Sequence, residues 1–308
     1  MVSGYLAMIA TLLLWSGFFL SLRSGAHSEL MTSDIAFTRF LVPCIILLPI
    51  VLKARQSILA VPKRYLLGMF IGSGLPYLFI AGTGMSFAPV ADGSALIPGT
   101  LPLFVSGIAI VLFKQPLSSH RIFGLGLVVV GIGAFLSHSI SNPSTQLLQG
   151  HVLFLLGSCM WAVFTICARV SNLNPLVTSG LVSLMSLCCL ITLTVSGVFE
   201  SHLLNNQISS WPWEELLGHT LLQGVGAGLI AAFTYLHAIS TLGAERTAAF
   251  GAATPAIATL LAMPIFSEQP NSTVWIALAF ISIGSVIASN IFMKQDSSLH
   301  YQPPSFEK

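Results

Sequence analysis

Residues 91–116, ADGSALIPGTLPLFVSGIAIVLFKQP, are the stretch from which the fold can be inferred. The stretch is apolar, and Pro98 and Pro102 stand in its middle, where each removes one helical hydrogen bond. Small residues recur at every fourth position, namely Ala91, Ala95 and Gly99. That spacing places them on one face of a helix, where a second backbone can approach closely. The stretch therefore predicts a tightly packed helix that is broken by proline.

The same pattern returns 153 residues further along, in residues 244–270, AERTAAFGAATPAIATLLAMPIFSEQP. Pro255 stands opposite Pro102, and Glu245 stands opposite Asp92. The small residues of this copy are Ala244, Ala248, Ala252 and Ala256. We therefore expect the chain to hold two copies of one broken helix.

The composition indicates that the chain is embedded in a lipid bilayer. It has 308 residues, of which 55% are hydrophobic and only 7% are charged, whereas a soluble domain carries about 25% charged residues. Its five cysteines all lie in apolar runs and show no metal-ligand spacing. We expect neither a metal nor a cofactor.

Ten apolar segments are long enough to cross a bilayer core, which requires ~20 residues per helix. They are residues 4–22, 34–52, 65–86, 91–112, 120–138, 149–168, 175–198, 214–240, 244–265 and 273–293. No connection between them could form a soluble domain. The sequence thus predicts an all-α integral membrane protein with ten transmembrane helices, followed by a disordered tail, residues 294–308.

The basic residues set the orientation, because Lys and Arg concentrate in cytoplasmic loops. With the N-terminus in the cytoplasm, ten of the twelve fall inside, Arg23 alone falls in an outer loop, and Arg39 lies within a span. The C-terminus is then cytoplasmic as well. The short chain suggests a bacterial protein, so we expect a multi-pass protein of the plasma (bacterial inner) membrane.

The repeat covers the whole chain. Three residues of the first span match three of the sixth at an offset of 146: Gly4 with Gly150, Trp15 with Trp161, and Arg23 with Arg169. The unit is therefore five spans, residues 1–140 and then 141–293. Because five is odd, the second copy enters the membrane from the opposite side. Inverted repeats of this kind are typical of transporters with a site at the repeat interface.

Several short motifs follow one another along the two halves in a characteristic order. They are Leu14-Trp15-Ser16-Gly17-Phe18, Arg39-Phe40-Leu41, Pro102-Leu103-Phe104, Gly124, Gly131-Ile132-Gly133, Trp161, Pro255, Glu268 and Gly284. In this order the chain resembles an EamA-type, ten-helix member of the drug/metabolite transporter superfamily over roughly residues 1–293. Lys114 departs from the family's usual Glu, and Gly180 stands where the first half has Arg39. The resemblance implies export of a small metabolite such as an amino acid or its derivative.

Arg39 is the only charge well inside a span, ~9 Å from its outer end at 1.5 Å per residue. An ionisable group within the membrane is a functional candidate that faces the bundle interior. In that role it would attract a carboxylate or phosphate on the solute. The alternative is that its side chain reaches the outer headgroups or ties helix ends together.

Aromatic residues in mid-membrane are further candidates for a solute pocket. Trp15 and Trp161 hold matching positions, and Tyr77 and Tyr235 lie in the third and eighth spans. An indole offers a flat stacking face and one donor, although each of these side chains could instead pack in the core. His237, near the inner end of its span, is either a proton relay or a packing residue.

The broken helices carry the candidate gating residues. Asp92 and Glu245 each open one of these helices, either as gates at opposite membrane faces or because carboxylates favour helix N-termini. Pro98, Pro102 and Pro255 free backbone carbonyls that must face protein or water. These carbonyls could bind the solute, or the prolines could simply kink the helices for packing.

These observations predict a secondary transporter that works by alternating access, with a cavity lined by spans 1, 3, 4, 6, 8 and 9. No Asp or Glu lies in mid-membrane, so coupling would use His237 or a carboxylate at a helix end, or be absent. No phosphate-binding loop supports ATP-driven pumping.

We expect that the protein is not an enzyme, since the sequence has no H-E-x-x-H motif and no paired intramembrane aspartates. A non-transporting membrane scaffold stays the alternative. The expected partners are a small-molecule solute and the lipid bilayer, without nucleic acid, and a homodimer is left open.

Overall fold

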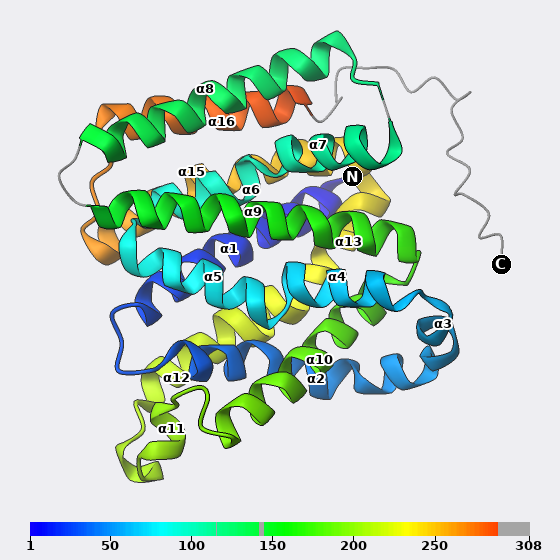
Figure 1. The fold of residues 1–308 in the computed structure, drawn as a ribbon, viewed down its shortest axis with the longest axis vertical. Coiled ribbons are helices and arrows are strands. Elements are labelled where there is room, and N and C mark those ends of the chain that lie inside the picture. Colours follow the sequence, from blue (N-terminus) through cyan, green and yellow to red (C-terminus); the bar gives the residue numbers. More distant parts are fainter. Residues whose placement is uncertain (115, 142–144, 289–308) are drawn as a thin grey trace.

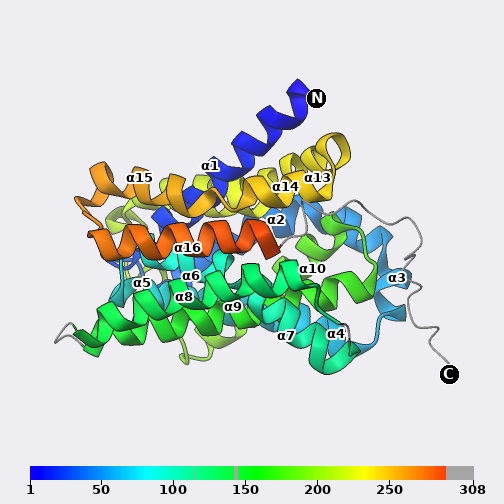
Figure 2. The ribbon, with the colours of Figure 1, turned by 90° about the horizontal axis from the view of Figure 1, so that it is seen from above.

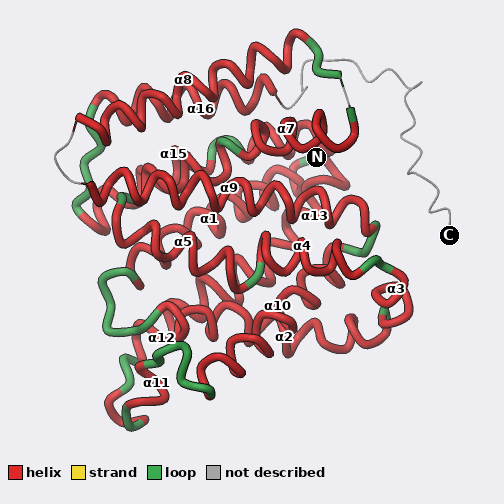
Figure 3. The backbone as a smooth tube through the Cα atoms, in the orientation of Figure 1, coloured by secondary structure: helices red, strands yellow, loops and turns green. Residues whose placement is uncertain are grey.

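The computed structural model describes residues 1–114, 116–141 and 145–288, which form helices joined by short connections (Figures 1 and 3). No β-strand occurs in these ranges. The first part contains α1 (Val2–Gly25), α2 (Thr32–Lys53), α3 (Arg55–Ala60), α4 (Lys63–Ser73), α5 (Leu75–Phe87), α6 (Val90–Gly99), α7 (Leu101–Phe113) and α8 (Ser119–Ser141). The second contains α9 (Thr145–Ser171), α10 (Pro175–Val195), α11 (His202–Asn205), the 3-10 turn η1 (Ile208–Ser210), α12 (Trp213–His219), the π-helix η2 (Thr220–Ile230), α13 (Ala231–Leu242), α14 (Ala244–Gly251), α15 (Thr254–Phe266) and α16 (Ser272–Ala288). The tail expected at 294–308 lies outside the described residues.

Eight helical segments are long and apolar enough to cross a membrane. The ninth and tenth expected spans correspond to shorter apolar helices, Thr254–Phe266 and Ser272–Ala288. The ninth is short because the chain breaks between α14 and α15, and the last five residues of the tenth, 289–293, are not described. Large hydrophobic side chains such as Leu13, Ile45 and Val111 are exposed on the bundle surface, as expected where a surface faces lipid. The chain is a multi-pass membrane protein.

The helices run to and fro between two ends of the bundle (Figure 1). We call one the α11 end, at the left of Figure 1; its connections are residues 26–31, 88–89, 196–212 and 267–271. The other is the α3 end, at the right; its connections include residues 54–62, 114, 116–118, 172–174 and 243. These two names are used for the ends from here on.

Helices far apart in the sequence pack against one another in a reciprocal pattern. The first helix, α1, lies against η2 and α13, while α9 lies against α4 and α5. Three further pairs join the two parts of the chain: α2 with α10, α6 with α15, and α8 with α16. The last pair lies side by side in both Figures 1 and 2. The core is thus built from contacts between residues 1–141 and 145–288, and neither part buries its apolar faces alone.

The α8–α16 pair depends on the absence of side chains at its crossing. A Cβ at Gly124 would lie 2.5 Å from the backbone nitrogen of Ala288 and 2.8 Å from the carbonyl oxygen of Gly284. A Cβ at Gly284 would in turn lie 2.6 Å from the carbonyl oxygen of Gly124. Because helices in lipid gain no hydrophobic energy by associating, such close backbone packing is a main source of their attraction.

We expect Gly124→Ala to destabilise the protein by roughly 1–3 kcal/mol, since the added methyl group meets backbone that cannot turn aside. The measurement is the melting temperature of the purified protein in detergent. Gly126→Ala is the matched control, because a Cβ there meets nothing within 4 Å. Equal melting temperatures for the two variants would contradict the packing described here.

Candidate functional site

Two helices are interrupted at equivalent places in the chain. The first break is at Thr100, between α6 and α7, with Pro98 before it and Pro102 after it. The second separates α14 from α15 at residues 252–253, and Pro255 follows it. Thr100 lies 153 positions before residue 253, which is the offset between the two copies in the sequence.

The carbonyl groups at the first break are satisfied within the protein. The backbone N–H of Thr100 donates to the carbonyl of Pro98, and its hydroxyl donates to the carbonyl of Leu96. The hydroxyl of Ser285, on α16, donates to the carbonyl of Gly99 at 2.8 Å. Lipid offers these groups no partner, so the protein supplies one for each.

The second break is satisfied in the same way. The carbonyl of Gly251, which Pro255 frees, accepts from the hydroxyl of Thr254 at 2.8 Å. Two of the carbonyls that these prolines free, that of Pro98 (freed by Pro102) and that of Gly251 (freed by Pro255), therefore each have a protein donor. The prolines shape the helices at positions where the backbone needs no solute to complete its hydrogen bonds.

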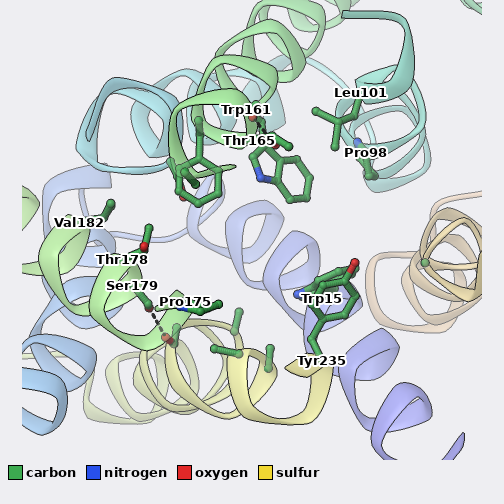
Figure 4. Close-up of a pocket in the computed structure, with 18 of the residues that line it drawn as sticks. Trp15, Pro98, Leu101, Trp161, Thr165, Pro175, Thr178, Ser179, Val182 and Tyr235 are labelled. Carbon is green, nitrogen blue, oxygen red and sulfur yellow. Dashed lines mark hydrogen bonds between the residues drawn. The ribbon is translucent and has the colours of Figure 1, made fainter. Parts of the chain in front are cut away.

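Both breaks border a large cavity of about 780 Å³ inside the bundle (Figure 4). Its walls come from α1, α2, α6, α7, α9, α10, α13, α15 and α16, with further residues from neighbouring segments. Seven residues that the sequence marks as candidates line it: Trp15, Arg39, Pro98, Pro102, Trp161, Tyr235 and Pro255. A volume of this size suits a small organic molecule.

Two pairs of aromatic rings stand at the cavity. Trp15 and Tyr235 lie with ring centroids 5.1 Å apart, and Figure 4 shows them together on one side. Trp161 lies on another side, and its ring centroid is 6.2 Å from that of Tyr77. Tyr77 is buried behind Trp161 and does not line the cavity. Each pair joins helices that lie far apart along the chain, α1 with α13 and α9 with α5.

Arg39 is held in place by groups from two other helices. Its guanidinium carbon lies 4.9 Å from the ring centroid of Phe18, on α1. Its Nη1 donates to the carbonyl of Gln223, on η2, at 3.3 Å. The amide of Gln223 in turn donates to the carbonyl of Phe18 at 3.1 Å. The three residues fix the guanidinium at the cavity wall.

The cavity reaches the α3 end of the bundle. Arg169 at the end of α9, and Leu173 and Pro175 beyond it, belong to its lining. None of the lining residues comes from the described connections at the α11 end. The solute-sized space is therefore placed toward one end only.

Charged and polar side chains join helices at the α11 end. Arg23 Nε donates to Glu268 Oε1 at 2.7 Å, and Nη1 of the same arginine donates to the carbonyl of Met85. The backbone N–H of Val90 donates to Glu268 Oε2 at 2.9 Å. This group, which we call the Arg23–Glu268 latch, ties together α1, α5, α6 and the connection before α16.

A second polar contact lies beside the latch. His151 Nε2 lies 2.6 Å from Asp92 Oδ2, and both side chains are almost fully buried. The pair joins the start of α6 to α9. Asp92 and Glu268 also line one small cavity of about 170 Å³ at this end. Asp92 is therefore placed at the α11 end and not at the large cavity.

Two other candidates stand apart from the large cavity. His237 is exposed on α13 and does not belong to the lining. The side chain of Glu245 lies outside what the structure describes. In the part of the chain that is described, no group of three or more His, Cys, Asp or Glu could hold a metal ion.

Sequence reasoning did not find the latch, although two signals for it were present. Arg23 is the one basic residue that the charge count leaves in an outer loop, and Glu268 is an isolated charge after the second broken helix. Arg23 departs from the cytoplasmic placement of the other basic residues, and Glu268 stands alone as a charge between apolar segments. His151 gave no such signal, because only the fold brings it to Asp92.

A helical membrane bundle around a solute-sized cavity that reaches one of its ends has the architecture of a membrane transporter. The comparison with known families agrees. The EamA-like transporter family matches residues 2–137 and again residues 148–290, so the chain belongs to this family.

Two relatives illustrate how far the likeness extends. An "uncharacterized transporter" of Clostridium kluyveri is 24% identical, and the match covers 93% of each chain. A solved structure, described only as the crystal structure of a protein, is 22% identical and superposes with a TM-score of 0.59 over 93% of this chain and 97% of that one. The second likeness shows the fold alone.

We expect Ser285→Ala to cost roughly 1–3 kcal/mol of stability, because it leaves the buried carbonyl of Gly99 without a donor. The matched control is Ser282→Ala, one turn away on α16, whose hydroxyl makes no hydrogen bond to any described residue. Melting temperatures in detergent compare the two. A drop for Ser282→Ala as large as for Ser285→Ala would contradict the proposed role of Ser285.

Proposed function

We propose that the chain is a secondary transporter that moves a small metabolite across the plasma membrane by alternating access. One observation carries the proposal. The large cavity reaches the α3 end, while the Arg23–Glu268 latch and the buried Asp92–His151 pair join helices at the α11 end. An opening at one end and a closure at the other is the arrangement that one state of such a transporter requires.

The proposal includes two five-span halves of inverted topology, residues 1–140 and 141–293. The family matches the chain twice, with a gap between residues 137 and 148. The reciprocal contacts, α1 on α13 and α9 on α4 and α5, are those that a two-fold axis within the membrane would generate. The two helix breaks, 153 residues apart, fit the same axis. Rocking of one half against the other would then exchange the open end.

The orientation follows from the charges. If the α3 end is cytoplasmic, the basic residues in and beside its connections face the cytoplasm, among them Lys53, Arg55, Lys63 and Arg64. Both termini then lie in the cytoplasm. In this orientation the cavity takes up its solute from the cytoplasm, which fits the export that we propose.

The cavity also limits the solute. Its volume lies within the range of ~300–1,000 Å³ that small-molecule sites occupy, and its aromatic rings offer flat faces to an apolar group. An amino acid or a derivative of similar size fits both features. The test is a thermal-shift screen of the purified protein against a metabolite panel, followed by counterflow in liposomes with each compound that stabilises it. If no such compound undergoes counterflow, the transport function is wrong.

The aromatic pairs give a second test. We expect Trp15→Ala and Trp161→Ala each to reduce counterflow of such a compound by roughly tenfold, which corresponds to the loss of about 1.4 kcal/mol of contact energy. Expression should be unchanged. Trp213→Ala is the control, since Trp213 is exposed on α12 and does not line the cavity. Normal flux in both cavity variants would remove the tryptophans from the site.

The Arg23–Glu268 latch gives a third test of the proposed function. Glu268→Gln removes the charge that holds Arg23, so the α11 end should open more often. We expect the amide of Val90, which donates to Glu268, to exchange its hydrogen about tenfold faster, equivalent to about 1.4 kcal/mol. Hydrogen exchange with mass spectrometry on peptides covering the start of α6 measures this rate. Glu214→Gln, at an exposed position on α12, is the control. Unchanged exchange in Glu268→Gln would contradict the latch.

A further inference from the structure

We propose that the cavity selects an organic anion without a free amine, and that the carboxylate or phosphate of this solute binds Arg39. The inference rests on the proposed transport function and narrows its substrate class. It is drawn from the charges of the lining, from the contacts of Arg39, and from the hydrogen bonds already made around the cavity.

Arg39 carries its positive charge at the cavity wall without an acidic counterpart among the described residues. No Asp or Glu among those residues belongs to the lining. Arg39 forms no ion pair with any carboxylate in the described ranges. A charge within a membrane protein is normally paired with an opposite charge or with backbone carbonyls. Arg39 contacts one carbonyl, that of Gln223, and no described residue supplies the opposite charge.

Most of the hydrogen-bonding capacity of Arg39 is free to bind a solute. The guanidinium has five N–H donors, and one contact to a protein oxygen, the carbonyl of Gln223 at 3.3 Å, is formed. The planar arrangement of the others matches a carboxylate or phosphate, which it can bind through two parallel hydrogen bonds. The site therefore has the donors for an anion and holds them in a fixed position against Phe18.

The contacts of Arg39 also decide against the alternative in which it reaches lipid headgroups. Its guanidinium lies between α1 and η2 at the cavity wall, where it contacts Phe18 and Gln223. The backbones of α2 and η2 are close there, since a Cβ at Gly224 would lie 2.4 Å from the carbonyl oxygen of Thr38. A long side chain held in this way is directed into the bundle and not toward its lipid-facing surface.

An ammonium on the solute would meet no carboxylate among the described residues of the lining. The carbonyls of Pro98, Gly99 and Gly251, at the two helix breaks, already accept from Thr100, Ser285 and Thr254. A positive group would also be repelled by Arg39. The lining thus favours a solute with a net negative charge over a zwitterionic solute.

The second half of the chain cannot supply an equivalent arginine. Gly180 holds the position that corresponds to Arg39, and it is packed against α2: a Cβ there would lie 2.7 Å from Val51 Cγ2 and 2.8 Å from Leu47 Cβ. There is no room for a long side chain. The anion subsite is therefore single, on the α2 side, and the aromatic rings are left to hold the apolar part of the solute.

The test compares probes that share one phenylpropyl skeleton and differ in charge. The anions are 3-phenylpropionate and N-acetylphenylalanine, with 3-phenylpropyl phosphate to separate a phosphate from a carboxylate preference. The others are phenylalanine as the zwitterion, 3-phenylpropionamide as the neutral compound and phenylalaninamide as the cation. Thermal shifts of the purified full-length chain in detergent give the dissociation constants. We expect at least one anion to bind tenfold or more tightly than the last three probes. Equal or tighter binding of phenylalanine, the amide or the cation overturns the proposal, and so does the absence of binding by all three anions.

Variants of Arg39 show whether this residue is the cause. Arg39→Gln should weaken binding of the anion at least tenfold and change binding of 3-phenylpropionamide less than twofold, and Arg39→Lys should restore part of the loss. Arg55→Gln is the matched control, because Arg55 is exposed on α3 and does not line the cavity. Anion binding that survives in Arg39→Gln, or that falls equally in Arg55→Gln, assigns the selectivity elsewhere.

Failure of the proposed transport function can be distinguished from failure of the proposed anion selectivity. If an anion binds the wild-type chain with the expected dependence on Arg39 but shows no counterflow in liposomes, the anion site stands and the transport proposal fails. If a neutral or cationic probe undergoes counterflow and the anions do not bind, the transport function stands and the anion selectivity fails.

Discussion

A backbone carbonyl inside a bilayer has no water to accept from, and this constraint governs how the chain can interrupt its helices. The breaks at Thr100 and at residues 252–253 are possible only because hydroxyl groups replace the lost donors: Thr100 and Ser285 at the first, Thr254 at the second. Ser285 belongs to α16, so the first break is completed by a helix from the last part of the described chain. The break, the packing of α16 beside it and the cavity that they border therefore form together.

The sequence was informative wherever one residue type has one physical meaning. The long apolar segments, the prolines at positions 102 and 255 and the tryptophans at 15 and 161 led to a membrane protein of the EamA-like transporter family, and all four of these residues line the large cavity. The sequence was less informative about the lengths of the individual helices. The ninth expected span is divided into α14 and α15, because an apolar run marks where a chain can enter lipid and not where its hydrogen bonding is interrupted.

Contacts between distant residues were beyond the reach of the sequence. His151 pairs with Asp92 because α9 packs on α6, and Arg23 meets Glu268 because α1 and the connection before α16 end at the same place. Nothing in the neighbourhood of His237 showed that its side chain would be exposed instead of turned to the cavity. Helical periodicity is weak in segments that are apolar on all sides, so the direction of a single polar side chain depends on packing that only the structure shows.

The π-helix η2, Thr220–Ile230, has a consequence for how the chain can change over time. Its hydrogen bonds join residues five apart, so it holds more residues per turn than an α-helix. Deleting or inserting one residue would change the angle through which the segment turns before α13 begins. Tyr235 would then turn away from Trp15. Over this segment, the number of residues is constrained as strongly as their identity, and homologues that preserve the ring pair should tolerate substitutions here more readily than gaps.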